Sequence, residues 1–326
     1  MNKEFTGYYA KEFQMLLNEK RSMGIKYRDE ERQLYIIDKL THNYDCTNGF
    51  PKELVTDYLH FNPNWAKATQ RLRLNLMRQI ALFLTKLEIP AYFADSPLKY
   101  NGERDFHPYI FSQQQIKDFF LYVDTHRNEN HLKSADFRCL IYRLLYSSGL
   151  RISEALNLRM ESVDFDKGTI FIKSSKNYKD RLLPIDIEIL KLMKSYACNY
   201  HKVYQAEDFF FQSAPGKAYS KCTVYAYYRK VLFEIGISHG GRKSGGPRLH
   251  DFRHTFCVHS FHRFLKNGIS YESALPLLSA YMGHSSIRAT AKYLHLTEEV
   301  FADITEKISI NTEDIIPDIG EIPNEK

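Results

Sequence analysis

The sequence has no segment suited to export or to a membrane. Its amino terminus opens without an apolar stretch, and no uninterrupted apolar run approaches the roughly 18 residues that a membrane helix needs. Cysteine is scarce as well: the five cysteines are odd in number, widely spaced and form no Cys-x-x-Cys pair. We therefore expect a cytoplasmic protein that contacts no membrane and has no disulfide scaffold.

Glycine and proline are also sparse. The chain has 15 glycines and 11 prolines among 326 residues, and its aromatic share is 14%. This composition excludes a collagen-like or a largely disordered chain. With a mean hydropathy of -0.44, a chain of this length is typical of a soluble globular protein with two domains.

Charge is divided unevenly along the chain. Residues 299–326 hold two basic and eight acidic residues, so they carry -6, and the remaining 298 residues carry +12 behind a net charge of +6. A basic body favours a polyanionic partner, because binding to phosphates releases counterions from a nucleic acid. A basic surface that is merely solvated is the alternative.

Residues 1–96 predict a bundle of helices. Apolar residues recur at helical spacing in four segments, and Pro51 can begin the third helix. The apolar positions are Phe13, Leu16 and Leu17, then Leu34, Ile36, Ile37 and Leu40, then residues 52–59, and finally Leu72, Leu76, Ile80, Leu82 and Phe83 within residues 65–87. Basic residues of the last segment would lie on its other face: Lys67, Arg71, Arg73 and Arg78.

A second domain is predicted over residues 111–310, after a linker of turn-forming residues at 97–110. Ser112 and Gln115 form a capping pattern at its start, and Gly149 can end an apolar helix over 136–146. Residues 163–185 switch to strand spacing. We expect a mainly α protein with a small antiparallel β-meander, then helices from 187 to about 294 that a basic loop at 239–248 interrupts. Residues 311–326 read as an acidic, disordered tail.

Several chemically suited residues follow one another in a fixed order in the second domain. They are Arg151 in Gly149-Leu150-Arg151-Ile152-Ser153-Glu154, Lys176 in a predicted β-turn, His250 and Arg253 in His-x-x-Arg, His284 after a glycine, and Tyr293. Each type is common in this chain, which has 23 tyrosines and 13 histidines. The ordered spacing distinguishes this set from that background.

This ordered set resembles the tyrosine recombinase family of phage-integrase-like, site-specific recombinases. The resemblance spans residues 111–296 and implies that the first domain is a core-DNA-binding domain. It also implies that Arg151 and Arg253 bind oxygens of the scissile phosphate, where guanidinium groups can act bidentately. His250 and His284 would assist there, and Tyr293 would be the nucleophile. A phenol needs a cationic pocket to react as phenolate at neutral pH.

Three residue assignments have alternatives. The general-acid lysine is taken as Lys176, from its spacing to Pro184, although Lys173 and Lys179 lie in the same hairpin. Glu154 would orient Arg151 or His250, or would be a simple helix N-terminal glutamate. Spacings such as His250-x-x-x-His254 superficially suit a metal, but we expect no metal site and no cofactor.

The implied activity is cleavage and rejoining of DNA through a 3′-phosphotyrosyl intermediate, for a mobile genetic element, without ATP or a divalent metal. Partners would be double-stranded DNA, a homo-tetramer on paired sites and an accessory DNA-bending factor, which places the protein at the nucleoid. Segment 298–304 is the candidate contact between protomers. Phosphate contacts are expected from Arg71, Arg73, Arg78, Arg242, Lys243 and Arg248.

Two other functions fit the same residues. A type IB topoisomerase-like enzyme would only relax DNA, and a catalytically silent architectural protein would bind DNA without forming a covalent adduct. The sequence specifies neither the target site nor the direction of the reaction.

Overall fold

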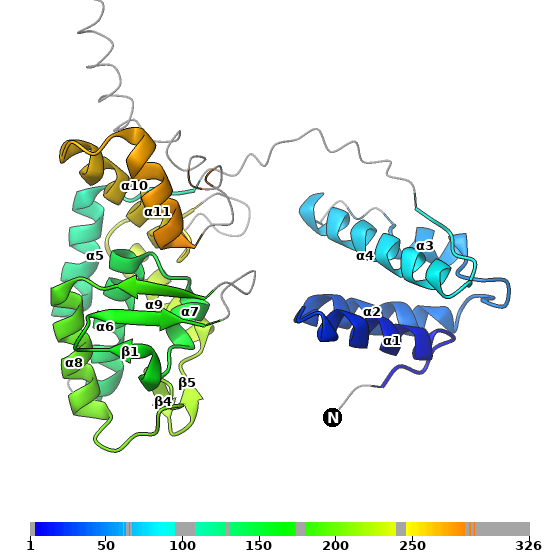
Figure 1. Ribbon diagram of the computed structural model, residues 1–326, viewed down its shortest axis with the longest axis horizontal. Coiled ribbons are helices and arrows are strands. Elements are labelled where there is room, and N and C mark those ends of the chain that lie inside the picture. The colour runs from blue at the N-terminus through cyan, green and yellow to red at the C-terminus, as the bar shows by residue number, and fades with distance from the viewer. Residues whose placement is uncertain are drawn as a thin grey trace, which may run out of the picture. The chain divides into compact units, whose positions relative to one another are not determined.

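The computed structural model describes residues 4–60, 62, 65, 67–94, 108–127, 131–173, 180–238, 246–283, 287 and 290. The chain forms two compact units, Met1–Glu103 and Arg104–Lys326. Each unit has its own hydrophobic core, so each is described by itself. Figure 1 shows both, with the first unit in blue and cyan.

The first unit is helical, as the apolar spacing predicts. Its helices are α1 (Ala10–Ser22), α2 (Arg28–Thr41), α3 (Lys52–Tyr58) and α4 (Lys67–Lys86). Phe13, Leu34, Leu54 and Ile80, one from each helix, are fully buried in a shared core. Burial of a large aliphatic or aromatic side chain stabilises a fold by roughly 1.5–3 kcal/mol, so this contact among the helices holds the unit together.

Helix α4 differs from the prediction in its rotation. Leu72 and Leu82 are 67% and 54% exposed, whereas Met77 and Leu84 are buried. Ile36 of α2, also predicted to face the core, is 47% exposed. Apolar residues occupy so much of the circumference of α4 that spacing alone permits more than one rotation, and packing against the other helices selects one.

The second unit has a helical core, and its first helix begins at the predicted cap. Ser112 caps α5 (Gln113–Thr125) in a capping box with Gln115. Helix α6 (Leu132–Ser148) ends at Gly149, whose φ of 59° is left-handed. Then follow the short α7 (Ile152–Leu156) and a 3₁₀ turn at Met160–Ser162. The left-handed turn at Gly149 ends α6 and directs the chain into α7, which places Arg151 between the two helices.

A three-stranded antiparallel sheet follows, in the order β1-β2-β3. Its strands are β1 (Val163–Asp164), β2 (Thr169–Ile172) and β3 (Arg181–Pro184), with Ile170 opposite Leu183 and Ile172 opposite Arg181. Ile170, Ile172 and Leu183 are buried in the core. The predicted β-meander is confirmed.

The rest of the described chain is helical apart from one hairpin. Helices α8 (Ile187–Tyr200), α9 (Lys221–Glu234), α10 (Asp251–Lys266) and α11 (Tyr271–Met282) follow the sheet, and α6 packs against both α8 and α10. Helices α10 and α11 lie together at one end of the unit (Figure 1). Nowhere in the described ranges is a helix long and apolar enough to span a membrane.

The hairpin, β4 (Gln212–Ala214) with β5 (Lys217–Ala218), is absent from our sequence prediction, which has only helices from 187 onward. Strands of two and three residues show no alternation to detect. The turn between them contains Gly216, with a φ of 67°.

Candidate active site

Arg151 occupies the junction between α6 and α7. It caps α7, and its backbone N–H donates to Oε2 of Glu154 at 2.9 Å. Its Nη1 donates to Oε1 of the same carboxylate at 2.7 Å. One glutamate therefore holds both the backbone and the guanidinium of Arg151, whose side chain is 20% exposed.

Glu154 also binds a second arginine, Arg181 of β3. Arg181 Nη1 and Nη2 donate to Oε1 and Oε2 at 3.1 and 2.8 Å, and the side chains of Arg181 and Glu154 are 9% and 6% exposed. Burial by itself raises the pKa of Glu154, but hydrogen bonds from Arg181 and Arg151 and the charge of Arg181 outweigh it and lower that pKa to about 2. Glu154 is thus a carboxylate throughout the physiological range, and it accepts the backbone N–H of Arg151, as a helix N-terminal glutamate does, while it also pairs with two guanidinium groups.

Arg253 lies in the first turn of α10 and is 2% exposed. Its Nη1 donates to the carbonyl of Gly149 and its Nη2 to the carbonyl of Met282. The guanidinium therefore links the turn that precedes Arg151 to the end of α11. Arg151 and Arg253, which are about 100 positions apart in the sequence, are held around the same glycine turn.

His250 precedes α10 and couples electrostatically to both arginines. Partial burial, and then the charges of Arg253, Arg151 and Arg248, lower the pKa of His250 to about 4. The residue as a whole is exposed, yet the three guanidinium charges all act in one direction. The imidazole is therefore neutral at neutral pH, with one ring nitrogen as donor and the other as acceptor.

Asp251, the residue after His250, binds Arg248. Its Oδ2 accepts from the backbone N–H of Arg248 at 2.7 Å, and its Oδ1 lies 3.5 Å from Arg248 Nη2. Asp251 is 1% exposed, and this burial raises its pKa to about 6. Arg248, a predicted phosphate contact, thus lies against the site with an exposed side chain.

Five predicted site residues lie outside the described residues. They are Lys176, His284, Tyr293, Arg242 and Lys243. Lys176 belongs to the stretch between the end of β2 and the start of β3, and His284 directly follows Gly283, the C-cap of α11 with a φ of 65°. The described part of the site therefore consists of Arg151, Glu154, His250 and Arg253, which the fold brings together, with Arg181 in addition.

The sequence prediction missed the contact of Arg181 with the site. The sequence does contain a signal, since Arg181 stands three residues before Pro184, the residue whose spacing identifies Lys176. A charged residue opening a strand is ordinarily solvated, so only the tertiary contact with Glu154 reveals its importance.

The predicted basic residues of α4 differ in what they do. Arg71 is exposed. Arg78 donates through Nε to the carbonyl of Ala94 at 3.1 Å. Arg73 donates to the carbonyl of Tyr58, and its guanidinium carbon lies 3.7 and 4.2 Å from the ring centroids of Tyr58 and Trp65. The guanidinium of Arg73 therefore has partners within the unit, as that of Arg78 does.

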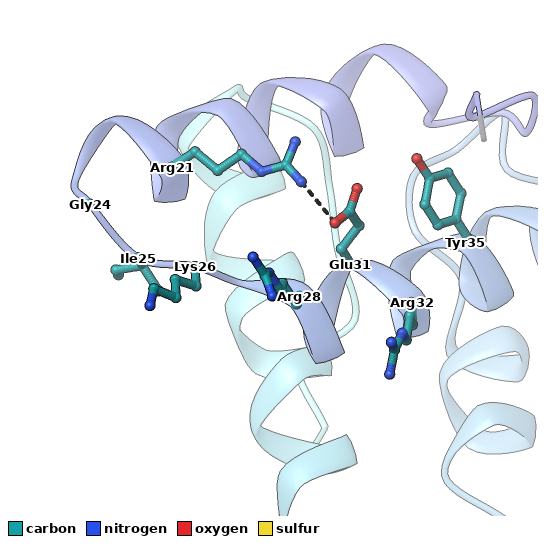
Figure 2. A pocket seen from close by; sticks show the side chains of 8 residues that line it. All are labelled: Arg21, Gly24, Ile25, Lys26, Arg28, Glu31, Arg32 and Tyr35. Atoms are coloured by element: carbon teal, nitrogen blue, oxygen red, sulfur yellow. Dashed lines mark hydrogen bonds and ion pairs between the residues drawn. The ribbon is translucent and has the colours of Figure 1, made fainter. Parts of the chain in front are cut away.

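A second basic cluster, also missed, surrounds the turn between α1 and α2. Figure 2 shows a cavity there with Arg21 at the end of α1, Lys26 in the turn, and Arg28 and Arg32 on α2. The cavity measures about 700 Å³, and Arg21 is paired with Glu31 at 2.8 Å. The sequence signal is a short basic stretch, Lys20, Arg21, Lys26 and Arg28, which has no helical spacing.

The described residues contain no cluster of side chains that could bind a metal ion. His254 Nε2 lies 3.9 Å from Asp251 Oδ1, and His259 Nδ1 is 2.9 Å from the hydroxyl of Tyr146. No group of three histidine, cysteine, aspartate or glutamate side chains is placed to hold an ion among those residues.

Comparisons with known proteins agree on one family. The sequence profile of the phage integrase family matches residues 110–299. The integrase/recombinase y4rB of Sinorhizobium fredii is 26% identical over 90% of this chain and 95% of its own length. The tyrosine recombinase XerA of Pyrococcus furiosus is 26% identical over 72% of this chain and 75% of its own length.

Solved structures share the fold. The Tn1549 transposon integrase, in complex with transposon right end DNA, covers 91% of this chain and 99% of its own with a TM-score of 0.61 at 16% identity. The XerH site-specific recombinase, bound to a palindromic difH substrate, covers 81% and 71% with a TM-score of 0.60 at 19% identity. Because the family profile matches more than half of the chain, the protein belongs to the phage integrase family and is a tyrosine recombinase, an enzyme of site-specific DNA strand breakage and rejoining.

Proposed function

We propose that Arg151 and Arg253 bind the non-bridging oxygens of a scissile DNA phosphate, and that Tyr293 attacks this phosphate in line. The attack forms a 3′-phosphotyrosyl bond and breaks the bond between the phosphorus and the 5′ oxygen, and Lys176 protonates that oxygen so that it leaves as a 5′-hydroxyl. The 5′-hydroxyl of a partner strand then attacks the phosphotyrosine and releases Tyr293. Because the phosphoester bond energy is conserved, rejoining needs no ATP.

The observation that carries this proposal is the arrangement around Gly149. Two guanidinium groups from distant segments are fixed at one turn before any substrate arrives. Preorganised charge stabilises a transition state because it needs no rearrangement when negative charge develops on the phosphate oxygens.

His250 fits this proposal as a neutral group. With its pKa lowered to about 4, the imidazole can donate a hydrogen bond to the phosphate, with His284 as a second donor. A bound phosphate would oppose the three arginine charges and raise the pKa of His250 again. The histidine is thereby suited to hold or pass a proton within the complex.

Both units contribute to DNA binding in this proposal. Phosphate contacts come from Arg71, Arg73 and Arg78 of α4 and from Arg242, Lys243 and Arg248 of the second unit. We add the basic cluster at the turn between α1 and α2, since its cavity is open and rich in guanidinium groups. Similar proteins bind DNA in solved complexes, a difH substrate for XerH and transposon DNA for the Tn1549 integrase.

The proposed assembly is a homo-tetramer on two paired DNA sites, with segment 298–304 of each protomer contacting its neighbour. A mobile genetic element is the proposed host, and a DNA-bending protein the proposed accessory factor. Such an enzyme would work at the nucleoid.

A covalent-adduct assay tests the chemistry. The wild type and Tyr293→Phe are incubated with nicked duplexes cut from the DNA that flanks the gene, and protein-linked DNA is separated on a denaturing gel. Tyr271→Phe is the matched control, because Tyr271 begins α11 and is 40% exposed. We expect adducts with the wild type and Tyr271→Phe, without metal or ATP, and none with Tyr293→Phe.

Other outcomes identify the alternatives. Adducts that survive Tyr293→Phe would show that another tyrosine is the nucleophile. DNA binding without any adduct would favour an architectural protein. Adducts that lead to relaxed but never recombined plasmids would favour a topoisomerase-like enzyme.

A further inference from the structure

Arg181 lies where three segments of the candidate site meet. It is the first residue of β3, directly after the stretch that holds Lys176. It donates both terminal nitrogens to Glu154, the partner of Arg151. It also packs against Gly283, the residue before His284: a Cβ built on Gly283 would lie 3.0 Å from Arg181 Cδ and 3.2 Å from Arg181 Nη1.

Positive charges outnumber negative ones among Arg151, Glu154 and Arg181. One carboxylate, Glu154, is shared by the two guanidinium groups of Arg151 and Arg181, so the trio carries one net positive charge. Glu154 also accepts from the backbone N–H of Arg151, which fixes the carboxylate beside that residue. If Arg181 lost its charge, Glu154 would pair with Arg151 alone, and the net charge next to the phosphate would fall to zero.

We propose that Arg181 is a positioning residue of the recombination reaction: it draws the Glu154 carboxylate away from full pairing with Arg151, so that the trio keeps a net positive charge beside the scissile phosphate and Arg151 keeps its geometry. This inference rests on the proposed function. Arg181 acts through Glu154, and the bidentate geometry explains why an arginine is required, because a lysine ammonium cannot contact both carboxylate oxygens in the same fork. The packing on Gly283 holds the guanidinium in that orientation.

The test uses charge compensation. Arg181→Met removes the positive charge while keeping a long side chain, Arg181→Lys keeps the charge without the fork, and Arg181→Met with Glu154→Gln removes both charges and restores the net charge beside the phosphate. Arg143→Met is the control, because Arg143 is half-buried in the same unit and paired with Asp124. Each variant is assayed for the single-turnover rate of adduct formation on the nicked duplexes and, separately, for noncovalent DNA affinity.

We expect Arg181→Met to slow adduct formation by about a hundredfold, the effect of misplacing a catalytic group by roughly 1 Å, with DNA affinity unchanged. The double variant should recover part of that loss, and Arg181→Lys should fall between the wild type and Arg181→Met. Arg143→Met should react like the wild type. A change of rate without a change of affinity separates positioning from general loss of binding.

Three results would overturn the inference. If Arg181→Met fails to fold, Arg181→Lys decides: a wild-type rate for Arg181→Lys would reject the requirement for a fork. A wild-type rate for a folded Arg181→Met, or a double variant no faster than Arg181→Met, would show that Arg181 has only a structural role. If the wild type itself forms no adduct, the proposed function fails first and the inference fails with it.

Discussion

The two arginines of the candidate site are held in different ways. Arg253 is almost completely buried, and its terminal nitrogens donate to two neutral backbone carbonyls, those of Gly149 and Met282. Arg151 is partly exposed and is held by the ionised side chain of Glu154. Carbonyl acceptors leave the charge of a guanidinium in place, whereas a carboxylate offsets part of it.

This difference separates two tasks. The two hydrogen bonds of Arg253 to the Gly149 and Met282 carbonyls, which we call the Arg253 socket, connect α10 to the ends of α6 and α11. This socket therefore serves the fold as well as the chemistry. The ion pair between Arg151 and Glu154, which we call the Arg151 socket, is electrostatic. Its strength depends on the balance of charge between Glu154 and Arg181. We therefore expect loss of Arg253 to affect stability and activity together, and changes in the Arg151 socket to depend on pH and on compensating charge.

Arg253→Met should have the largest effect. It leaves two buried carbonyls without their donors, at a cost of about 1–3 kcal/mol each, and removes a transition-state contact worth about a hundredfold to a thousandfold in rate. Urea unfolding and the adduct assay measure the two effects separately.

Arg253→Lys is the sharper variant, because an ammonium keeps the charge but lacks the planar fork that reaches both carbonyls. It should regain part of the stability and little of the rate. Wild-type stability for Arg253→Met would contradict the idea that this residue links the three helix ends.

The sequence contained enough to predict the helices, the β-meander and the turn at Gly149, because each has a local signal. The apolar period predicts α1 and α2, the Ser112 and Gln115 pair predicts the start of α5, and a glycine after an apolar helix predicts a left-handed end. These signals arise within one or two turns of chain, where spacing and capping act directly.

Tertiary contacts explain what the sequence could not provide. The contact between Arg181 and Glu154 joins residues 27 positions apart, and nothing local distinguishes Arg181 from a solvated arginine. The same holds for Arg73, whose position between Tyr58 and Trp65 depends on how α3 and α4 pack. Both residues carry charge, and only packing decides whether that charge faces DNA or a partner inside the fold.

Acid should weaken the Arg151 socket before the Arg253 socket. Glu154 has a pKa of about 2 in the fold against an ordinary value of 4.5, so as the pH falls the unfolded chain takes up the proton first. The ionised Glu154 contributes roughly 3 kcal/mol to the free energy of unfolding. This contribution is fully present above about pH 5 and is lost between about pH 5 and pH 2.

The measurement is the difference in unfolding free energy between the wild type and Glu154→Gln across this range. Taking the difference removes the contribution of Asp251 to the unfolding free energy, which both proteins share. The pKa of Asp251 is raised to about 6, so this residue has the opposite effect and adds stability as the pH falls through that value. The gap between the two proteins should close toward pH 2. A gap that stays constant with pH would mean that Glu154 stabilises the fold by packing and not by its charge.

A pair of glycine substitutions isolates the turn on which the Arg253 socket depends. Gly149 and Gly236 have φ values of 59° and 75°, so an alanine at either position costs about 1–2 kcal/mol in left-handed backbone strain. A Cβ at Gly236 meets nothing within 4 Å, whereas one at Gly149 would lie 2.6 Å from Phe256 Cδ1 and 2.7 Å from Met282 Sδ. Gly149→Ala should therefore be less stable than Gly236→Ala by about 1–3 kcal/mol, the usual cost of overpacking. Because the Gly149 carbonyl accepts from Arg253, Gly149→Ala should also slow adduct formation, while Gly236→Ala should not.

Equal losses of stability in urea unfolding would show that the chain around Phe256 and Met282 relaxes freely, and that the turn does not fix Arg253.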